Sequence, residues 1–187
     1  MMSKDVSDLL AWFKNDRAVP EAIAGFTFQP QVLLTTTTRQ RSLYRGVMNL
    51  LVAGQTRDFH TFKTITPSLA DLEGIDDHHI FPQAFLRKRG AAAVRHKDSI
   101  LNRTLIGKYT NTRIGQKAPS IYLGEMRSEL GTKLDTLLES HLLPKGKASS
   151  LTKDDFSGFL KWRQDAIWER IETVTSHPAN QTTAGDR

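Results

Sequence analysis

Apolar residues recur at the spacing of an amphipathic helix in several separate stretches of the chain. Leu43, Val47 and Leu51 form part of the clearest stripe, and Gly54 follows it at a position typical of a helix end. The stretch 18–38, with its prolines and its run of threonines, lacks such a pattern and is expected to be irregular. The stripes predict helices over residues 3–15, 39–53, 108–116, 119–130, 132–143 and from 156 onward.

Prolines and small polar residues mark where some of these helices begin and end. Pro119 suits the first turn of a helix, because a missing amide proton costs nothing there. Pro144 is expected to end the helix over 132–143, and Thr152 and Asp155 can cap the last helix. These signals set the predicted boundaries in the second half of the chain.

Two short runs in the middle of the chain predict strands instead of helices. The first covers residues 75–81 and is ended by Pro82, and the second covers residues 101–106 and is closed by Gly107. One strand pair among many helices predicts an α+β fold that is mostly helical.

The composition is that of a globular chain without thiol chemistry. Of the 187 residues, 39% are hydrophobic, which is enough to build a core. The absence of cysteine excludes disulfides, a thiol nucleophile, iron–sulfur clusters and cysteine-ligated zinc. No apolar run reaches the length of a membrane span and the N-terminus lacks the order of a signal peptide, so no membrane association and a cytoplasmic location are expected.

Positive charge is concentrated in one segment of the chain. The 26 Lys and Arg against 20 Asp and Glu give a net charge of +6, but residues 85–117 alone carry nine cations and a single acid, Asp98. That segment is therefore at +8 and the remaining chain is slightly acidic. Such a block is often only a solvated face, yet here it overlaps the candidate chemistry, which favours a phosphate-rich partner.

The candidate chemistry lies in two adjacent histidines, His78 and His79, with Asn102 and Asn111 downstream. Adjacent side chains on a strand point to opposite faces, so one imidazole could bind a metal while the other reaches a water molecule. Phosphodiester hydrolysis needs an activated water and a cation at the leaving oxygen. A neutral histidine is a suitable base near pH 7, and an asparagine oxygen suits Mg²⁺. A histidine pair taken alone is more often incidental.

These residues resemble the HNH (ββα-metal) nuclease motif: His-His-Ile-Phe-Pro, then an asparagine 23 residues after His79 and another 9 residues later. The wider region 44–171 is similar to the C-terminal HNH domain of GmrSD-type restriction endonucleases. The similarity includes the Lys-x-Pro-x-x-Tyr element at Lys117 and the Phe-x-x-Phe-Leu-x-x-Arg helix that begins at Phe156. It implies a central ββα-metal motif flanked by N- and C-terminal helices.

The resemblance assigns a role to each matching residue. His79 would be the catalytic base, His78 and Asn111 the metal ligands, and Asn102 a catalytic-motif residue whose role is to brace the loop between the strands. The implied cofactor is a divalent metal, with Mg²⁺ expected and Mn²⁺ as an alternative. The cations expected to contact the nucleic acid are Arg87, Lys88, Arg103, Lys108, Arg113 and Lys117.

Several other residues that could carry chemistry have simpler, structural interpretations. Asp76 and Asp77 could orient an imidazole, although solvation at the start of a strand is favoured for Asp76. The tryptophans are expected in the core or at an interface. Surface or capping positions are expected for His60, His96, His141 and His177.

The chain also departs from the family pattern. It lacks the Asp-Gly-Gln-Gln-Arg box of the nucleotide-binding domain that precedes many such nucleases, and it has no Walker motif. We therefore expect the nuclease half alone, no nucleotide in this chain, and a separate nucleotide-binding partner subunit. Cutting both DNA strands would favour a homodimer. The predicted segments are a helical flank (1–68), the HNH core (69–130), a helical support (131–175) and a flexible tail (176–187).

Three functions remain open from the sequence. The preferred one is a metal-dependent DNA endonuclease acting in restriction or phage defence. A second is a nucleic-acid-binding or regulatory subunit that keeps the fold without turnover. A helical docking domain is ranked last, because it would leave the order of the histidines and asparagines to chance.

Overall fold

The computed structural model describes residues 4–14, 19–20, 29–37, 41–66 and 74–175, which fall into two units. The smaller unit comprises residues 1–29 and 172–187 and contains helix α1 (Lys4–Lys14), close to the predicted bounds. The larger unit, residues 30–171, carries the candidate site. The predicted tail over 176–187 lies outside the described residues.

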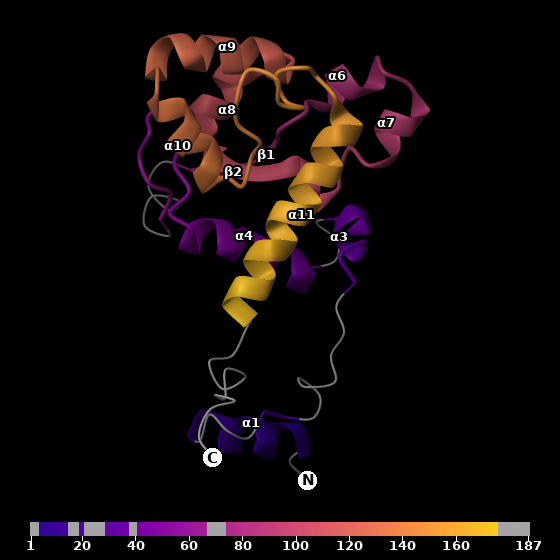
Figure 1. Ribbon diagram of the computed structural model, residues 1–187, viewed down its shortest axis with the longest axis vertical. Coiled ribbons are helices and arrows are strands. Elements are labelled where there is room, and N and C mark those ends of the chain that lie inside the picture. The colour runs from indigo at the N-terminus through magenta and orange to yellow at the C-terminus, as the bar shows by residue number, and fades with distance from the viewer. Residues whose placement is uncertain (1–3, 15–18, 21–28, 38–40, 67–73, 176–187) are drawn as a thin grey trace, which may run out of the picture. The chain divides into compact units, whose positions relative to one another are not determined.

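The larger unit is mostly helical with one small sheet, so the predicted α+β class is confirmed (Figure 1). The elements of the larger unit in chain order are α3 (Val32–Thr35), α4 (Arg41–Ala53), β1 (Ile75–His79), α6 (Gln83–Arg87), α7 (Ala91–Arg95), the 3₁₀ turn η1 (Ile100–Asn102), β2 (Arg103–Gly107), α8 (Lys108–Ile114), α9 (Pro119–Leu130), α10 (Lys133–Ser140) and α11 (Phe156–Thr175), whose last residues belong to the smaller unit. None of the described helices combines the length and apolar character needed to cross a membrane.

The two strands pair antiparallel, from Ile75 opposite Gly107 to His79 opposite Arg103. Both are shorter than predicted. β1 ends at His79 instead of residue 81, and residues 100–102 form a 3₁₀ turn instead of the start of a strand. β2 starts late for a local reason, because the hydroxyl of Ser99 accepts a hydrogen bond from the Leu101 amide (3.2 Å) and turns the chain before it. β1 then ends at His79, whose partner Arg103 is the first residue of β2.

Three helices were not predicted. α3 lies in the stretch expected to be irregular, and α6 and α7 lie between the strands. The last two span five residues each, which is too short to show a helical stripe. α6 forms because Leu86 is completely buried and its amide donates to the carbonyl of Pro82 (3.1 Å).

Most predicted helix ends agree with the structure. The Gly54 amide donates to Leu50 (2.9 Å) just after α4, and Pro119 occupies the first turn of α9. Asp155 caps α11 by accepting from the Gly158 amide (3.0 Å). Thr152 does not cap this helix, because its hydroxyl donates to carbonyls of the preceding loop. α10 ends at Ser140, three residues earlier than predicted.

The core lies where α11 and α9 meet the end of β1. The ring of Phe81 is fully buried and lies 5.1 Å from those of Phe156 and Phe159, measured between centroids. Tyr122 of α9 donates to the carbonyl of Ile80 (3.0 Å). Burying one such aromatic side chain contributes about 2–3 kcal/mol, so these contacts hold the strand end in place.

Some residues are placed differently from the prediction. His141, expected at the surface or in a cap, is completely buried, because its ring packs against Phe59 (4.5 Å between centroids) and bonds to Thr104 and Arg57. Trp162, expected in the core or at an interface, is 42% exposed.

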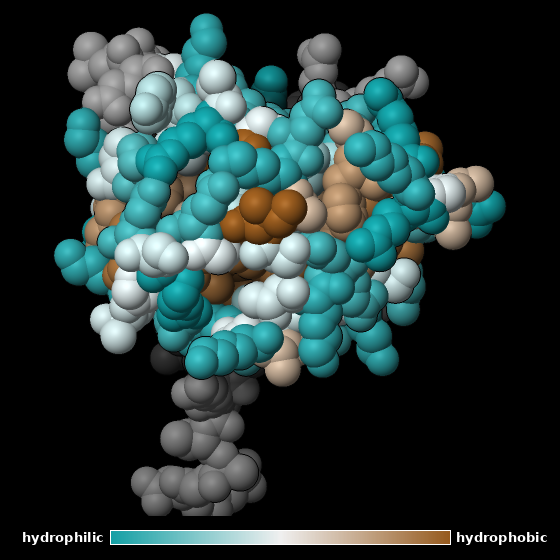
Figure 2. Space-filling view, turned by 90° about the horizontal axis from the view of Figure 1, so that it is seen from above, coloured by the Kyte–Doolittle hydropathy of each residue, from teal (hydrophilic) through white to brown (hydrophobic). Residues whose placement is uncertain are grey.

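Seen from above, the molecule presents a mainly hydrophilic face with small, separate hydrophobic spots (Figure 2). Ile121 of α9 is an exposed apolar side chain. The residues one turn further along this helix, Gly124 and Glu125, are exposed and add no apolar side chain beside it. Isolated apolar residues of this kind are normal on a protein surface.

Candidate active site

A cavity of about 270 Å³ opens at the end of β1. It brings together three of the predicted motif residues, His78, His79 and Asn111, from a strand and a helix separated by more than thirty positions in the sequence. Asn102 does not line it. The lining residues are Asp77, His78, His79, Pro82, Gln83, Ala84, Arg87, Asn111, Gly115 and Gln116.

The two residues predicted as metal ligands touch each other. Nδ1 of His78 lies 2.7 Å from Oδ1 of Asn111. The amide nitrogen of Asn111 donates to a carboxylate oxygen of Asp76 (2.8 Å), which keeps the amide oxygen turned toward His78. The favoured interpretation of Asp76 as simple strand-start solvation is therefore wrong, since its carboxylate orients a candidate ligand.

His78 is held neutral by its surroundings. It is 3% exposed, and its ring meets those of Phe59 and Tyr122 edge-on. Burial lowers the pKa of His78 from 6.5 to about 4, although the bond to Asn111 opposes the shift. The imidazole is consequently uncharged near pH 7, which is the form that binds a cation.

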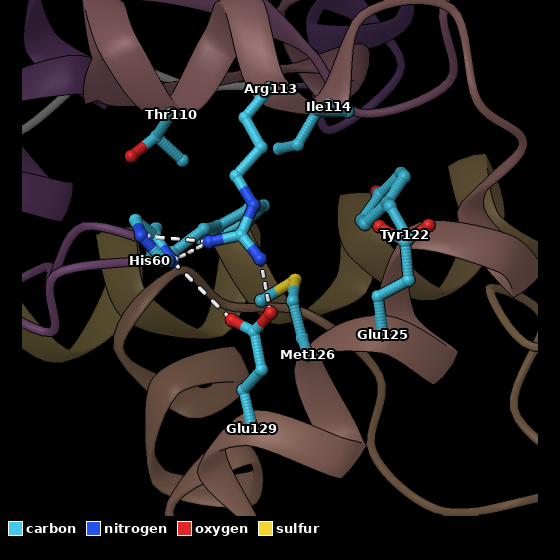
Figure 3. A pocket seen from close by; sticks show the side chains of 9 residues that line it. His60, Thr110, Arg113, Ile114, Tyr122, Glu125, Met126 and Glu129 are labelled. Carbon is cyan, nitrogen blue, oxygen red and sulfur yellow. Dashed lines mark hydrogen bonds and ion pairs between the residues drawn. The ribbon is translucent and has the colours of Figure 1, made fainter.

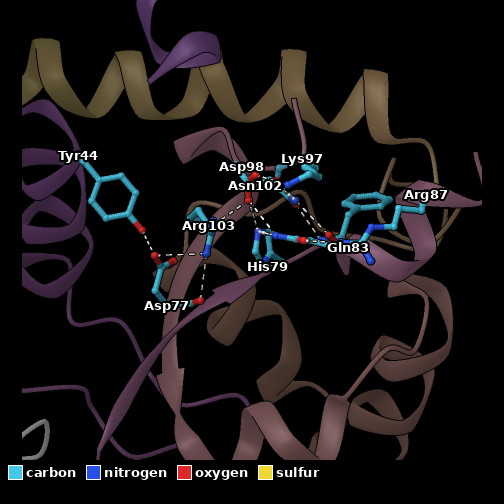
Figure 4. Close-up of polar contacts among 10 residues, drawn as sticks. Tyr44, Asp77, His79, Gln83, Arg87, Lys97, Asp98, Asn102 and Arg103 are labelled. Carbon is cyan, nitrogen blue, oxygen red and sulfur yellow. Dashed lines mark hydrogen bonds and ion pairs between the residues drawn. The ribbon is translucent and has the colours of Figure 1, made fainter. Parts of the chain in front are cut away.

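His79 points to the other face of β1, as the alternation of a strand predicts. Its Nε2 lies 2.9 Å from Oδ1 of Asp98 and 3.0 Å from the amide nitrogen of Gln83, which itself donates to Asp98 (Figure 4). Burial lowers the pKa of His79, and the nearby charge of Arg103 adds to this, while Asp98 opposes it. The ring is therefore available as a base near neutral pH.

The carboxylate of Asp98 is the centre of a charged network beside His79. Burial would raise its pKa, but hydrogen bonds from Lys97 and His79 and the charges of Lys97 and Arg103 hold the pKa near 2. Arg103 bridges Asp98 (3.0 Å) and Asp77 (3.4 Å), and Tyr44 of α4 donates to Asp77 (Figure 4). The Asp98 carboxylate beside His79 is therefore ionised at physiological pH.

The sequence did not identify Asp98, Gln83 or Tyr44 as parts of the site. Two signals could have found the first two: Asp98 is the single acid of the basic segment, and Gln83 directly follows Pro82 of the motif. Tyr44 had no signal, because it reaches Asp77 from α4, 33 residues away.

Asn102 closes the connection between the strands. Its side chain is fully buried, accepts from the amide of Phe81 (2.8 Å) and donates to the carbonyls of Phe81 (3.0 Å) and Lys97 (2.9 Å). These are the contacts of a brace that joins the end of β1 to the chain before β2.

The six cations expected to bind nucleic acid fall into different environments. Arg103 has an 11% exposed side chain and is held between two acids. Arg113 pairs with Glu129 of α9 and contacts His60 (Figure 3). Lys117 pairs with Glu125, also of α9 (2.7 Å). Arg87 lines the cavity, whereas Lys88 and Lys108 are exposed and Lys108 borders a different cavity.

The donor atoms present are compatible with a hard divalent cation. Among the described residues, no three His, Asp or Glu side chains converge as a complete metal cage. His78 and Asn111 nevertheless lie side by side, and because an amide oxygen only accepts, Nδ1 of His78 carries the proton of their 2.7 Å hydrogen bond. The lone pair of His78 that could bind a cation is then on Nε2, which is buried without a hydrogen-bond partner among the described residues. Mg²⁺ commonly takes few protein ligands and completes its shell with water and phosphate.

Comparison with known proteins identifies a relative but no family. No family model matches the chain, and no solved structure matches it. An uncharacterized protein of Methanocaldococcus jannaschii is 29% identical to this chain in an alignment of length 200, which covers 94% of this chain and 33% of that protein. The chain thus spans about a third of the length of the curated relative that it matches.

Proposed function

We propose that this protein is a metal-dependent endonuclease with an HNH site that hydrolyses DNA phosphodiester bonds in restriction or phage defence. The observation that carries the proposal is the convergence of His78, His79 and Asn111 on one cavity, with Asn102 bracing the loop beside it. β1, β2 and α8 follow one another in that order, with α6, α7 and η1 in the connection between the strands, and this is the ββα order that such a site requires.

In this proposal His79 is the general base. A carboxylate can only accept hydrogen bonds, so Nε2 of His79 carries the proton that Asp98 accepts, and Nδ1 holds the free lone pair. Nδ1 takes a proton from water, the resulting hydroxide oxygen bonds to phosphorus, and the bond from phosphorus to the 3′ oxygen breaks. The departing 3′ oxygen takes a proton from a solvent water, and the imidazolium returns its own proton to solvent. The negative charge of Asp98 stabilises the imidazolium that forms.

The remaining residues bind and orient. His78 and Asn111 would hold the divalent cation, expected to be Mg²⁺ with Mn²⁺ as the alternative, which supplies positive charge for the departing oxygen when bound. Asp76 keeps the Asn111 oxygen facing that position. Arg87 lies on the cavity wall, where its guanidinium can contact a flanking phosphate.

A plasmid assay tests the proposal. Supercoiled DNA, unmodified or carrying methylated or glucosylated bases, is incubated with the chain in Mg²⁺, Mn²⁺ or EDTA. We expect metal-dependent conversion to nicked or linear DNA, lost in His79→Ala and retained in His60→Ala, a matched histidine outside the cavity. Cleavage that survives His79→Ala would contradict the assignment of the base.

A second candidate is a nucleic-acid-binding or regulatory subunit without turnover. It is favoured by the length of the archaeal relative, about three times that of the matched region. This alternative predicts salt-sensitive DNA binding in EDTA that is unchanged in His79→Ala, with no cleavage. A separate nucleotide-binding partner and a homodimer stay predictions, to be tested by adding that partner and by measuring the mass in solution.

A further inference from the structure

A short arm of two helices, residues 83–95, connects β1 to β2 and carries positive charge without acids. It contains α6, Gly90 and α7 (Figure 1). No Asp or Glu occurs within it. Its four cations are all exposed: Arg87, Lys88, Arg89 and Arg95.

These cations differ from the other basic residues near the site in having no carboxylate partner. Within the described residues, none of the four forms an ion pair, whereas Arg103, Arg113 and Lys117 all do. Arg87 reaches only the side-chain oxygen of Gln83 (3.4 Å). A phosphate group that approached the arm would therefore displace no internal anion.

Arg89 is the cation of the arm that has acids in its vicinity. Its guanidinium lies over the ring of Phe85 (4.7 Å to the centroid) and borders a cavity with Asp154 and Asp155. Those two carboxylates are used elsewhere: Asp154 accepts from Ser120 (2.9 and 2.7 Å), and Asp155 caps α11. Neither carboxylate forms an ion pair with Arg89 within the described residues, although both keep their negative charge beside the same cavity.

The arm is anchored at one end and open at the other. Leu86 is completely buried, and the ring of Phe85 lies 6.0 Å from that of Phe81 in the core. α7 has no buried residue and starts with three alanines after Gly90, whose φ is +93°. Small side chains of this kind let a partner approach the backbone closely.

The position of the arm relates it to the cavity, because Arg87 lines the same cavity as His78 and His79. We infer that the arm is the docking surface for duplex DNA: its four cations contact backbone phosphates and lead the strand into the cavity. This inference rests on the proposed function. It also assigns a smaller part in binding to Arg103, Arg113 and Lys117, whose charges are already paired.

The test measures DNA binding in EDTA, so that it does not depend on cleavage. The full chain, the arm variant R87Q/K88Q/R89Q/R95Q and the control R127Q/K145Q/K147Q/K161Q are titrated onto a fluorescent duplex at several salt concentrations. Both variants lose the same charge from exposed positions. We expect the arm variant to lower the salt slope of the binding constant by about 3 to 4 and the affinity at 0.1 M salt by at least about 100-fold. The losses of affinity and of salt slope in the control variant are expected to be less than about a tenth of those in the arm variant.

Each outcome separates the inference from the function. Binding lost in the arm variant alone supports the inference, even where the wild type cleaves nothing and the nuclease proposal fails. Equal binding by the arm and control variants overturns the inference, whether or not DNA is cut. No binding of duplex by the wild type overturns it as well. If the quadruple variant does not fold, the single variants Lys88→Gln and Arg95→Gln replace it, and each is expected to lower the slope by about 1. An unchanged slope in both single variants overturns the inference.

Discussion

Replacing Asn102 by alanine removes three hydrogen bonds from the centre of the fold. The amide and carbonyl of Phe81 would then have no partner, and Phe81 is completely buried, so water cannot reach these groups. A buried polar group that loses its partner costs about 1–3 kcal/mol. Two such groups predict a loss of about 2–6 kcal/mol in the free energy of unfolding, a large share of the about 5–15 kcal/mol typical of a domain.

Urea denaturation followed by circular dichroism measures this loss, with Asn111→Ala as the matched control. Asn111 is half-buried and faces the cavity, where water can replace its bonds to His78 and Asp76, so we expect a loss below about 1 kcal/mol. Under the proposed function, Asn111→Ala nevertheless loses metal-dependent cleavage. A loss below about 1 kcal/mol for Asn102→Ala, or equal losses for both variants, would refute the assignment of Asn102 as the brace.

Three further predictions follow from the core and the network beside His79. Burial lowers the pKa of His141 to about 3, so the folded state excludes a proton that the unfolded chain binds. The free energy of unfolding therefore holds its full contribution from neutral His141 above about pH 6.5 and falls by a few kcal/mol toward pH 3. The melting temperature of His141→Gln should depend less on pH than that of the wild type. Asp98→Asn should lower the single-turnover cleavage rate by about 100-fold with little change in DNA affinity, because the charge opposite His79 is lost. Phe159→Ala should cost about 3–5 kcal/mol in urea denaturation, because its fully buried ring packs on Phe81; a loss below about 1 kcal/mol would contradict that packing.

Most of the helices could be predicted because they depend on local order in the chain. The apolar stripe before Gly54 and the proline at the start of α9 act within one or two turns, so α4 and α9 have nearly the predicted bounds. The alternation of a strand also separated His78 from His79 correctly. The pattern over residues 108–116 placed Asn111 on a helix, and the family resemblance paired it with His78.

Contacts between distant segments decided the rest. α6 depends on the burial of Leu86, and the pairing of Arg113 with Glu129 needs α8 and α9 to lie side by side. No pattern within either segment reports these contacts. Likewise, the carboxylate that reaches His79 comes from Asp98, which in the sequence is only a break in a run of positive charge.

By itself, then, the sequence determined the fold class and most helix ends, since short-range hydrogen bonding and apolar periodicity encode these directly. The tertiary structure decided which charges remain free. Arg103 and the cations of the arm look alike in the sequence, but folding brings Arg103 into ion pairs with Asp77 and Asp98, whereas none of the arm's cations forms an ion pair within the described residues. The difference arises from Coulomb attraction at distances of a few ångströms, which only the folded chain sets.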